Sequence, residues 1–325
     1  MTTKFCNFLK LKDFKINELL KILKKSFDLK YNIDMNIYKP FANKSLAMIF
    51  EKPSTRTRVS FDVGMYQLGG QAIYLNAEDI QIGRGETIED TARILSEYVN
   101  IVMIRTFEQE KVEKLAKFAT IPIINGLSDL YHPCQILSDI FSIMEERKDV
   151  FDFYNLVNIE SKFNKIKFLY IGDSTSNIAN SLLNASAIFG IDIYFISPKN
   201  YELNPSLLKE ANSMAKQSGG KINQLDNIDD LKEKFDIIYT DIWISMGKEY
   251  EKEKRYKALK SYQVNKKLLD RCAKKDVKVM HCLPAHRGEE ITDDILENPT
   301  SIVFKQAGNR LHVQKAIMLY TMNQI

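Results

Sequence analysis

The feature that most constrains the fold is an alternation of short apolar, β-rich runs with stretches of helical periodicity. In the first half of the chain the expected strands are residues 45–50, 71–75, 101–105 and 121–125. Between two of them, residues 87–98 bring Ile88, Ala92, Leu95 and the adjoining Val99 onto one helical face. Strands that alternate with helices predict an α/β fold, in which parallel sheets carry helices on both faces.

A second series of the same kind follows a charged, less regular stretch at residues 145–165. Its expected strands are residues 166–171, 191–196, 235–239, 277–282 and 301–304. We interpret the charged stretch as a connection, and the two series as two domains. The Lys- and Glu-rich run at residues 248–260 is interpreted as a solvated helix or loop face.

Composition excludes several classes of protein. The 325 residues include 46 Lys and Arg against 42 Asp and Glu, a balance that does not favour nucleic-acid binding. Four Cys residues without a C-x-x-C pair do not suggest a disulfide scaffold, and a reducing cytoplasm is expected. The first residues do not have the pattern of a secretory leader, and the sequence contains no apolar run of about 18 residues that could span a membrane.

Ligands of open α/β sheets bind beyond the carboxyl ends of the strands, and polar residues gather at those positions here. Ser54-Thr55-Arg56-Thr57-Arg58 follows the first expected strand, with Pro53 suited to a first helical turn. Hydroxyls, guanidinium groups and free backbone N–H groups at a helix start favour an anion, best a phosphate. A capped helix with surface Arg side chains is the alternative. The G-x-x-x-x-G-K loop of ATP sites is absent.

Three further residues belong to the same expected edge. Arg105 ends a strand, and His132 and Gln135 lie three residues apart where His132-Pro133 opens a helix. A charged strand end that faces water explains Arg105 equally well. A lone His is more often structural than catalytic, and a lone Gln is even less informative.

Polar residues also follow the expected strands of the second series. Residues 172–177 form a polar turn without G-x-G-x-x-G, which disfavours a dinucleotide and suits a small zwitterion. Asp241 at a strand end can pair with an ammonium group, and Gly247 indicates either a mobile loop or a simple turn.

The segment His281-Cys282-Leu283-Pro284-Ala285-His286 contains H-C-x-x-x-H. Adjacent residues at a strand end should point to opposite faces, so zinc ligation by His281 and Cys282 together is not favoured. Cys282 stays open as a nucleophile, since His residues are available as bases. Arg310, placed before an expected C-terminal helix, extends the cationic pattern.

Taken together, these motifs resemble the aspartate/ornithine carbamoyltransferase family over nearly the whole chain. The family-wide motifs are S-T-R-T-R at residues 54–58 and H-P-x-Q at 132–135. S-M-G at residues 245–247 and H-C-L-P at 281–284 resemble the ornithine branch, and N-R-x-H-x-Q-K-A at 309–316 completes the set. The resemblance implies a carbamoyl-phosphate domain at residues 1–150, with helix 309–325 packing back on it, and an ornithine domain at 151–308. It also implies a homotrimer, a cis Leu283–Pro284 bond, and neither a metal nor an organic cofactor.

The resemblance also implies a site for carbamoyl phosphate and L-ornithine. The carbamoyl-phosphate residues are Ser54, Thr55, Arg56, Thr57, Gln81, Arg105, His132, Gln135, Cys282, Leu283 and Arg310. Among them Arg105, His132, Gln135, Cys282 and Arg310 are the expected catalytic set. The ornithine residues are Asn177, Asp241, Ser245 and Met246. Cys282 is then a ligand contact, and Gln81 reaches a neighbouring subunit's pocket.

Two departures and two alternatives accompany the resemblance. Ser176 stands where many relatives have Asn, and Gly308 replaces a common Glu, which is expected to loosen the turn presenting Arg310. One alternative is a sister carbamoyltransferase acting on putrescine, N-acetylornithine or aspartate. The other is a non-catalytic regulatory protein on the same fold.

Overall fold

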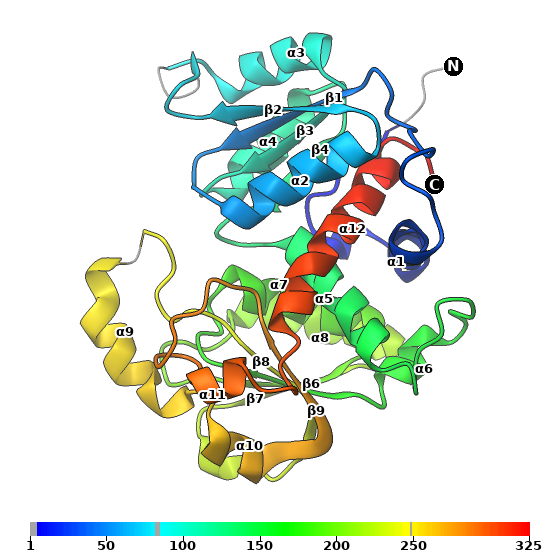
Figure 1. Cartoon of the computed structure of the whole chain (residues 1–325). Helices are drawn as coiled ribbons and strands as arrows, with labels where there is room; N and C mark the ends of the chain where they lie inside the picture. Colours follow the sequence, from blue (N-terminus) through cyan, green and yellow to red (C-terminus); the bar gives the residue numbers. More distant parts are fainter. Residues whose placement is uncertain (1–4, 82–84, 248) are drawn as a thin grey trace. The chain divides into compact units, whose positions relative to one another are not determined.

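The computed structural model describes residues 5–81, 85–247 and 249–325, and the chain divides into two compact units. Unit 1 consists of Met1–Glu146, Asp152–Tyr154 and Gly308–Ile325, and unit 2 of Arg147–Phe151 and Asn155–Ala307. Both are shown in Figure 1. Each unit is built on one parallel sheet, which confirms the predicted α/β fold.

Unit 1 holds a four-stranded parallel sheet in the order β2-β1-β3-β4. Its strands are β1 (Ser45–Phe50), β2 (Gln71–Asn76), β3 (Ile101–Arg105) and β4 (Ile123–Leu127). Its helices are η1 (Leu11–Asp13), α1 (Ile16–Tyr31), α2 (Thr55–Gln67), α3 (Ile88–Tyr98), α4 (Gln109–Phe118), α5 (Pro133–Glu146) and most of α12 (Val303–Thr321). Apolar residues of α3 and α4 pack on one sheet face, whereas α2 and α5 lie on the other (Figure 1).

Unit 2 holds a five-stranded parallel sheet in the order β7-β6-β5-β8-β9. Its strands are β5 (Lys167–Ile171), β6 (Asp192–Ile196), β7 (Lys221–Leu225), β8 (Phe235–Thr240) and β9 (Ala273–His281). Its helices are α6 (Ile159–Phe163), α7 (Asn177–Phe189), α8 (Pro205–Ser218), η3 (Ile228–Asp230), η4 (Glu249–Glu251), α9 (Lys252–Leu259), η5 (Lys260–Tyr262), α10 (Lys266–Cys272) and α11 (Asp293–Leu296). A buried cluster joins β5, β8 and β9 to α10 and α11, and α7 and α8 cover the opposite face (Figure 1).

One predicted strand was wrong, and one strand was missed. Residues 301–304 were expected to form a strand, but Ser301 makes only an isolated bridge to Val279, and helix α12 begins at Val303. A short run of buried apolar residues does not distinguish a strand from a helix start. Strand β7 was not expected, because its sequence, Lys-Ile-Asn-Gln-Leu, belongs to a partly exposed edge strand with little apolar content.

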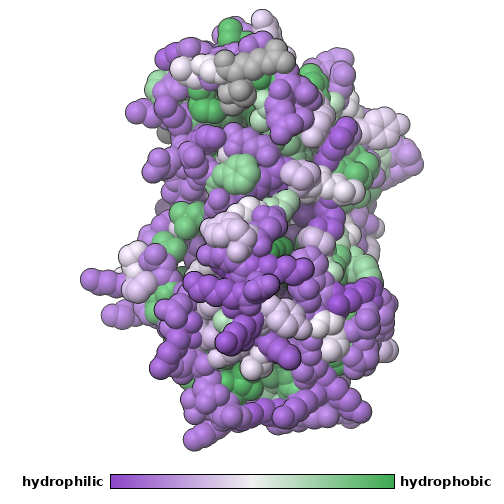
Figure 2. Space-filling view, turned by 90° about the vertical axis from the view of Figure 1, so that its left-hand side faces the viewer, coloured by the Kyte–Doolittle hydropathy of each residue, from purple (hydrophilic) through white to green (hydrophobic). Residues whose placement is uncertain are grey.

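Large apolar side chains are exposed on several elements of both units. On the face drawn in Figure 2, hydrophilic residues predominate over both units, with apolar ones between them. In the described ranges, no helix combines the length and the apolar character that a membrane crossing requires.

Candidate active site

The carboxyl ends of β1, β3 and β4 meet at one edge of the unit 1 sheet, because these strands are adjacent and parallel. Helix α2 begins directly after β1, and Ser54 caps it, since its hydroxyl oxygen accepts from the Thr57 backbone N–H at 3.2 Å. Arg105 is the last residue of β3, and His132 follows β4. The expected phosphate residues therefore lie at one sheet edge and one helix N-terminus.

Thr57 is the point at which two distant guanidinium groups meet. Its buried hydroxyl oxygen accepts from Arg310 Nη2 at 2.9 Å and from Arg105 Nη1 at 3.4 Å. Both Arg side chains are buried. Two buried cations on one hydroxyl repel each other, so an anion bound between them lowers the electrostatic cost of their burial.

His132 stands at the start of α5 among the same charges. Burial lowers the pKa of its imidazole well below the ordinary value, and the nearby cations Arg310, Arg105 and Arg56 lower the pKa further. The imidazole is therefore neutral near pH 7, and one ring nitrogen carries a proton that a ligand oxygen can accept.

The side-chain oxygen of Gln135 is a buried hydrogen-bond acceptor in this region. Its side chain is 1% exposed and its Nε2 donates to Asp139 Oδ1 at 2.9 Å. Among the described residues no hydrogen-bond donor reaches the buried Oε1 of Gln135. That oxygen is suited to an N–H group of a ligand, because a buried acceptor without a donor is costly.

Arg310 reaches this edge from inside a helix, and not from a helix start as expected. Helix α12 begins seven residues earlier, at Val303, and Gly308 lies within it. Added to Gly308, a Cβ atom would contact nothing within 4 Å. The expectation that Gly308 loosens a turn presenting Arg310 is therefore wrong, because a regular helix carries both residues.

A buried network fixes the helical turn that carries Arg310. Asn309 donates from Nδ2 to Glu145 Oε2 at 2.7 Å and to Ser142 Oγ at 2.9 Å, while its Oδ1 accepts from Lys30 at 2.7 Å. Lys30 also pairs with Glu145 at 2.7 Å, and Tyr31 donates to the same carboxylate at 2.6 Å. Helices α1, α5 and α12 are thereby tied together within unit 1.

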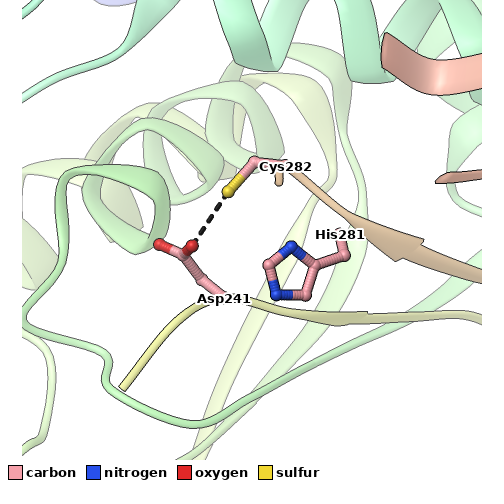
Figure 3. A group of neighbouring side chains, drawn as sticks. All are labelled: Asp241, His281 and Cys282. Atoms are coloured by element: carbon pink, nitrogen blue, oxygen red, sulfur yellow. Dashed lines mark hydrogen bonds between the residues drawn. The ribbon is translucent and has the colours of Figure 1, made fainter. Parts of the chain in front are cut away.

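In unit 2 the strand ends bring together a carboxylate and a thiol. Asp241 directly follows β8, and Cys282 directly follows the neighbouring β9. The Cys282 thiol donates to Asp241 Oδ1 at 2.8 Å, as Figure 3 shows, and the same oxygen accepts from the Ile242 N–H at 2.8 Å. Burial raises the pKa of Asp241, although His281, the Cys282 thiol and the Ile242 N–H act in the opposite direction.

The expected divergence of His281 and Cys282 was wrong. One ligand-type atom each from Asp241, His281 and Cys282 lies within 4.8 Å of the others (Figure 3), because Cys282 lies just beyond the last residue of β9, where a regular pleat is no longer required. Both side chains have protein partners, however. His281 Nδ1 accepts from the Leu283 N–H at 2.8 Å, and His281 Nε2 contacts a Glu290 oxygen at 3.0 Å.

Leu283 stands directly after this pair in an unusual conformation. It has a φ of 57°, and its bond to Pro284 is cis, as the resemblance implied. The His281–Glu290 contact was not predicted from the sequence.

The remaining expected ornithine residues lie at the same sheet edge or in the segment after it. Asn177 is the first residue of α7, and Ser176 caps that helix by accepting from the Ala179 N–H at 3.1 Å. Ser245 is half-buried and Met246 is 41% exposed. Gln81 is exposed, in the loop that follows β2, directly before residues 82–84, which lie outside the described ranges.

One member of the charged run at residues 248–260 is not solvated. Arg255 is buried, pairs with Asp173 at 2.6 Å and also bonds to Glu251 at 2.7 Å. Composition did not indicate this pair, because Asp173 lies 82 positions earlier in the chain. The ion pair ties the polar turn after β5 to α9.

The two units thus define an α/β protein, with a cationic strand edge in unit 1 and an acidic strand edge in unit 2. Family models match both parts: "Aspartate/ornithine carbamoyltransferase, carbamoyl-P binding domain" over residues 6–145, and "Aspartate/ornithine carbamoyltransferase, Asp/Orn binding domain" over residues 164–321. The chain belongs to the aspartate/ornithine carbamoyltransferase family.

Individual relatives agree with this assignment. The ornithine carbamoyltransferase of Thermococcus kodakarensis is 47% identical over 316 residues, which cover 97% of this chain and 96% of the relative. The structure resembles the ornithine carbamoyltransferase of Pyrococcus furiosus, with a TM-score of 0.89, 44% identity and coverage of 100% and 99%. It also resembles the anabolic enzyme of Campylobacter jejuni, with a TM-score of 0.88, 38% identity and coverage of 98% and 99%.

Proposed function

We propose that this chain transfers the carbamoyl group of carbamoyl phosphate to the δ-amine of L-ornithine, giving L-citrulline and phosphate in arginine biosynthesis. The observation that carries the proposal is the convergence of Arg105 and Arg310 on Thr57 beside a neutral His132. The names of the matching family models and relatives support both substrates.

The unit 1 edge has the groups that carbamoyl phosphate requires. Ser54, Thr55, Arg56 and Thr57 at the start of α2, together with Arg105, bind the phosphate. His132 and Arg310 donate to the carbonyl oxygen, where negative charge develops as the amine attacks. Gln135 Oε1 and the Leu283 carbonyl accept from the carbamoyl NH₂ group.

The unit 2 edge has groups that match the amino-acid end of ornithine. Asp241, with Cys282 beside it, receives the α-ammonium, and Asn177 receives the α-carboxylate. Ser245 and Met246 close over the bound molecule. The δ-ammonium has a Lys-like pKa of about 10.4, so it must lose a proton before its nitrogen attacks. The attacking nitrogen forms a bond to the carbonyl carbon, and the bond from that carbon to the phosphate oxygen breaks.

Cys282 acts as a ligand contact in this scheme. Its S–H group donates a hydrogen bond to Asp241. The sulfur therefore keeps its proton, and the thiolate that nucleophilic catalysis requires is not formed in this arrangement. Because the thiol is used in its reduced form, a reducing compartment, the cytoplasm, is part of the proposal.

The acceptor amine follows from Asp241 and the neighbouring motifs. A carboxylate for an α-ammonium favours a free amino acid over putrescine and N-acetylornithine, and H-C-L-P argues against aspartate. A non-catalytic protein has no need of the complete polar set. The test is an assay of ureido product with each of the four amines at a fixed carbamoyl phosphate concentration. Citrulline formed from ornithine is expected, whereas turnover of another amine alone, or of none, would contradict the proposal.

A homotrimer with shared sites is also proposed. Several apolar side chains are exposed on α2, on the edge strand β2 and on α3, where a second copy of the chain would cover them. They are Val59, Val63, Tyr66, Ile73, Tyr74, Ile94 and Tyr98. Gln81 follows β2 and is assigned to the phosphate pocket of the adjacent subunit.

Mixed trimers test the shared site. A disruptive Gln81 variant is first shown to be strongly impaired, then refolded together with Arg56→Ala chains. If the two residues come from different chains, random assembly restores about a quarter of the sites. Activity near that level supports sharing, and no recovery in confirmed mixed trimers would place each site within one chain.

A further inference from the structure

A second group of ligand-type side chains lies in the loop after β9, outside the residues assigned to substrates. It consists of His286, Glu289 and Glu290, each of which offers one ligand atom, and these atoms lie within 4.8 Å of one another. His286 Nδ1 and Glu289 Oε2 are 3.5 Å apart. His286 is exposed, Glu289 is partly exposed and Glu290 is 0% exposed.

Glu290 is a buried carboxylate, and among the described residues no Lys or Arg side chain forms an ion pair with it. Its Oε1 accepts from the His286 backbone N–H at 2.6 Å and contacts His281 Nε2 at 3.0 Å. His281 Nδ1 accepts from the Leu283 N–H, which leaves Nε2 as the ring nitrogen that donates to Glu290. An isolated buried anion is unfavourable unless a cation or further donors satisfy it.

The other oxygen of Glu290 has no such donor. Among the described residues, Glu290 Oε2 is buried without a hydrogen-bond partner, and so is Glu289 Oε2. Two carboxylate oxygens held near each other disfavour joint ionisation. A divalent cation bound by both carboxylates would reduce this repulsion and could give an orphaned oxygen a partner.

We propose that His286, Glu289 and Glu290 bind a divalent transition-metal ion of the Zn²⁺ class. Bonds of about 2.1 Å in a tetrahedral site place neighbouring ligand atoms about 3.4 Å apart, close to the His286–Glu289 separation. An imidazole with two carboxylates suits Zn²⁺ and Co²⁺, whereas Mg²⁺ prefers oxygen ligands alone. Three protein ligands leave a position for water, and the hydrogen bonds to Glu290 Oε1 orient that carboxylate.

The site is separate from the Asp241–His281–Cys282 group, whose hydrogen bonds already engage Cys282 Sγ and His281 Nδ1. The two groups are nevertheless joined, because Glu290 contacts His281, which holds the backbone of Leu283. A metal bound to Glu290 would thus influence the hydrogen bonds, through His281, that hold the Cys282–Leu283 segment in place.

The test is Co²⁺ binding to the chelator-treated full-length protein, followed by equilibrium dialysis and by visible absorption. We expect saturable binding of one Co²⁺ per chain, competed by Zn²⁺ but not by Mg²⁺, with no sulfur-to-cobalt charge-transfer band. The His286→Ala and Glu289→Gln substitutions change side chains at or near the surface, so the folded state should survive. Each should weaken Co²⁺ binding by about 100-fold or more, since each removes a direct ligand.

Two control variants locate the ion. Asp294→Asn removes an exposed carboxylate of the same region that is not in the group, and it should bind Co²⁺ like the wild type. Cys282→Ser should also keep full binding. Absence of saturable binding to the wild type, unchanged binding by His286→Ala, or loss of binding in Cys282→Ser would each overturn the proposal. No substrate is present, so the outcome is independent of the carbamoyl-transfer assay.

Discussion

The two sheets present the same geometry with opposite chemistry. At the unit 1 edge, Arg105 and Arg310 bond to Thr57, and burial together with the surrounding positive charge lowers the pKa of His132 and keeps its imidazole neutral. At the unit 2 edge, Asp241 and Cys282 share a hydrogen bond, and burial raises the pKa of the carboxyl group. In both units, adjacent parallel strands deliver the polar residues to one place.

This difference shows that the strand ends fix where a ligand binds, while the side chains fix which ligand it is. The cationic edge is suited to an anion and the acidic edge to an ammonium group. Variants that change the charge of one edge should therefore affect one substrate much more than the other.

The largest expected effect comes from Arg56→Ala. The variant loses a charge-assisted phosphate contact at a position where charge develops on the leaving group, so the rate should fall by about 10²–10³-fold or more. The matched control is Arg58→Ala, which removes an Arg two positions away that is exposed and packs over the Tyr74 ring. Citrulline assays should find Arg58→Ala nearly normal. Normal turnover in a folded Arg56→Ala protein would contradict the assignment of Arg56 to the phosphate site.

Asp241→Asn should act on ornithine. Loss of a charged hydrogen bond costs about 1.5–3 kcal/mol, which corresponds to an increase of about 10–150-fold in the KM for ornithine. In the wild type this KM should also rise as the pH falls through the raised pKa of Asp241, because the protonated carboxyl no longer attracts an ammonium group. Steady-state kinetics against pH measure both effects. Asp229→Asn, which alters an exposed carboxylate of unit 2, is the control and should leave the KM unchanged.

Cys282→Ser should weaken ornithine binding less than Asp241→Asn does. It should also retain measurable turnover, because a hydroxyl still donates to Asp241. A covalent mechanism through the sulfur would lose nearly all activity. Mass spectrometry of the wild type during turnover gives a second readout. A carbamoyl thioester on Cys282, or a folded but inactive Ser variant, would argue for covalent catalysis.

His312→Gln tests, through stability, the positive charge around the middle of α12. Burial, followed by the nearby Lys315 and Lys30, lowers the pKa of His312 to about 4, below its ordinary value of 6.5. Between these two values the unfolded chain binds more protons than the folded one, so wild-type stability should fall as the pH drops through this window. Urea unfolding at pH 7 and pH 5 should show a smaller loss for the variant. An equal loss of stability in both proteins would show that His312 does not cause this pH dependence.

The smallest effect is expected for Gly308→Ala. Gly308 is helical and a Cβ there meets nothing within 4 Å, so the variant should gain about 0.5–1 kcal/mol in the free energy of unfolding. Gly64→Ala in α2 is the matched control, because its Cβ would lie 3.2 Å from Lys315 Cγ. Denaturant unfolding should find a gain only at position 308, and a loss there would show that the glycine is needed.

The sequence was most informative where local patterns determine structure. Periodicity predicted the strands of both sheets except β7, and strand-end motifs brought the residues around Thr57 and Asp241 under consideration. Contacts between distant positions could not be predicted in this way. The Asp173–Arg255 pair and the tie of Asn309 to Lys30 and Glu145 depend on tertiary packing. The helical setting of Arg310 was also missed, since buried apolar residues at 302–303 fit a strand equally well.

The central claim is that the anion binds at the unit 1 edge and the amine at the unit 2 edge. Equilibrium binding of inorganic phosphate to the wild type, Arg56→Ala and Asp241→Asn tests it most directly, because it requires neither turnover nor a second substrate. We expect binding to weaken at least about tenfold in Arg56→Ala, the loss of one charge-assisted contact, and to remain at the wild-type level in Asp241→Asn. Equal affinities in the wild type and Arg56→Ala, or a loss confined to Asp241→Asn, would contradict the division of the two substrates between the two edges.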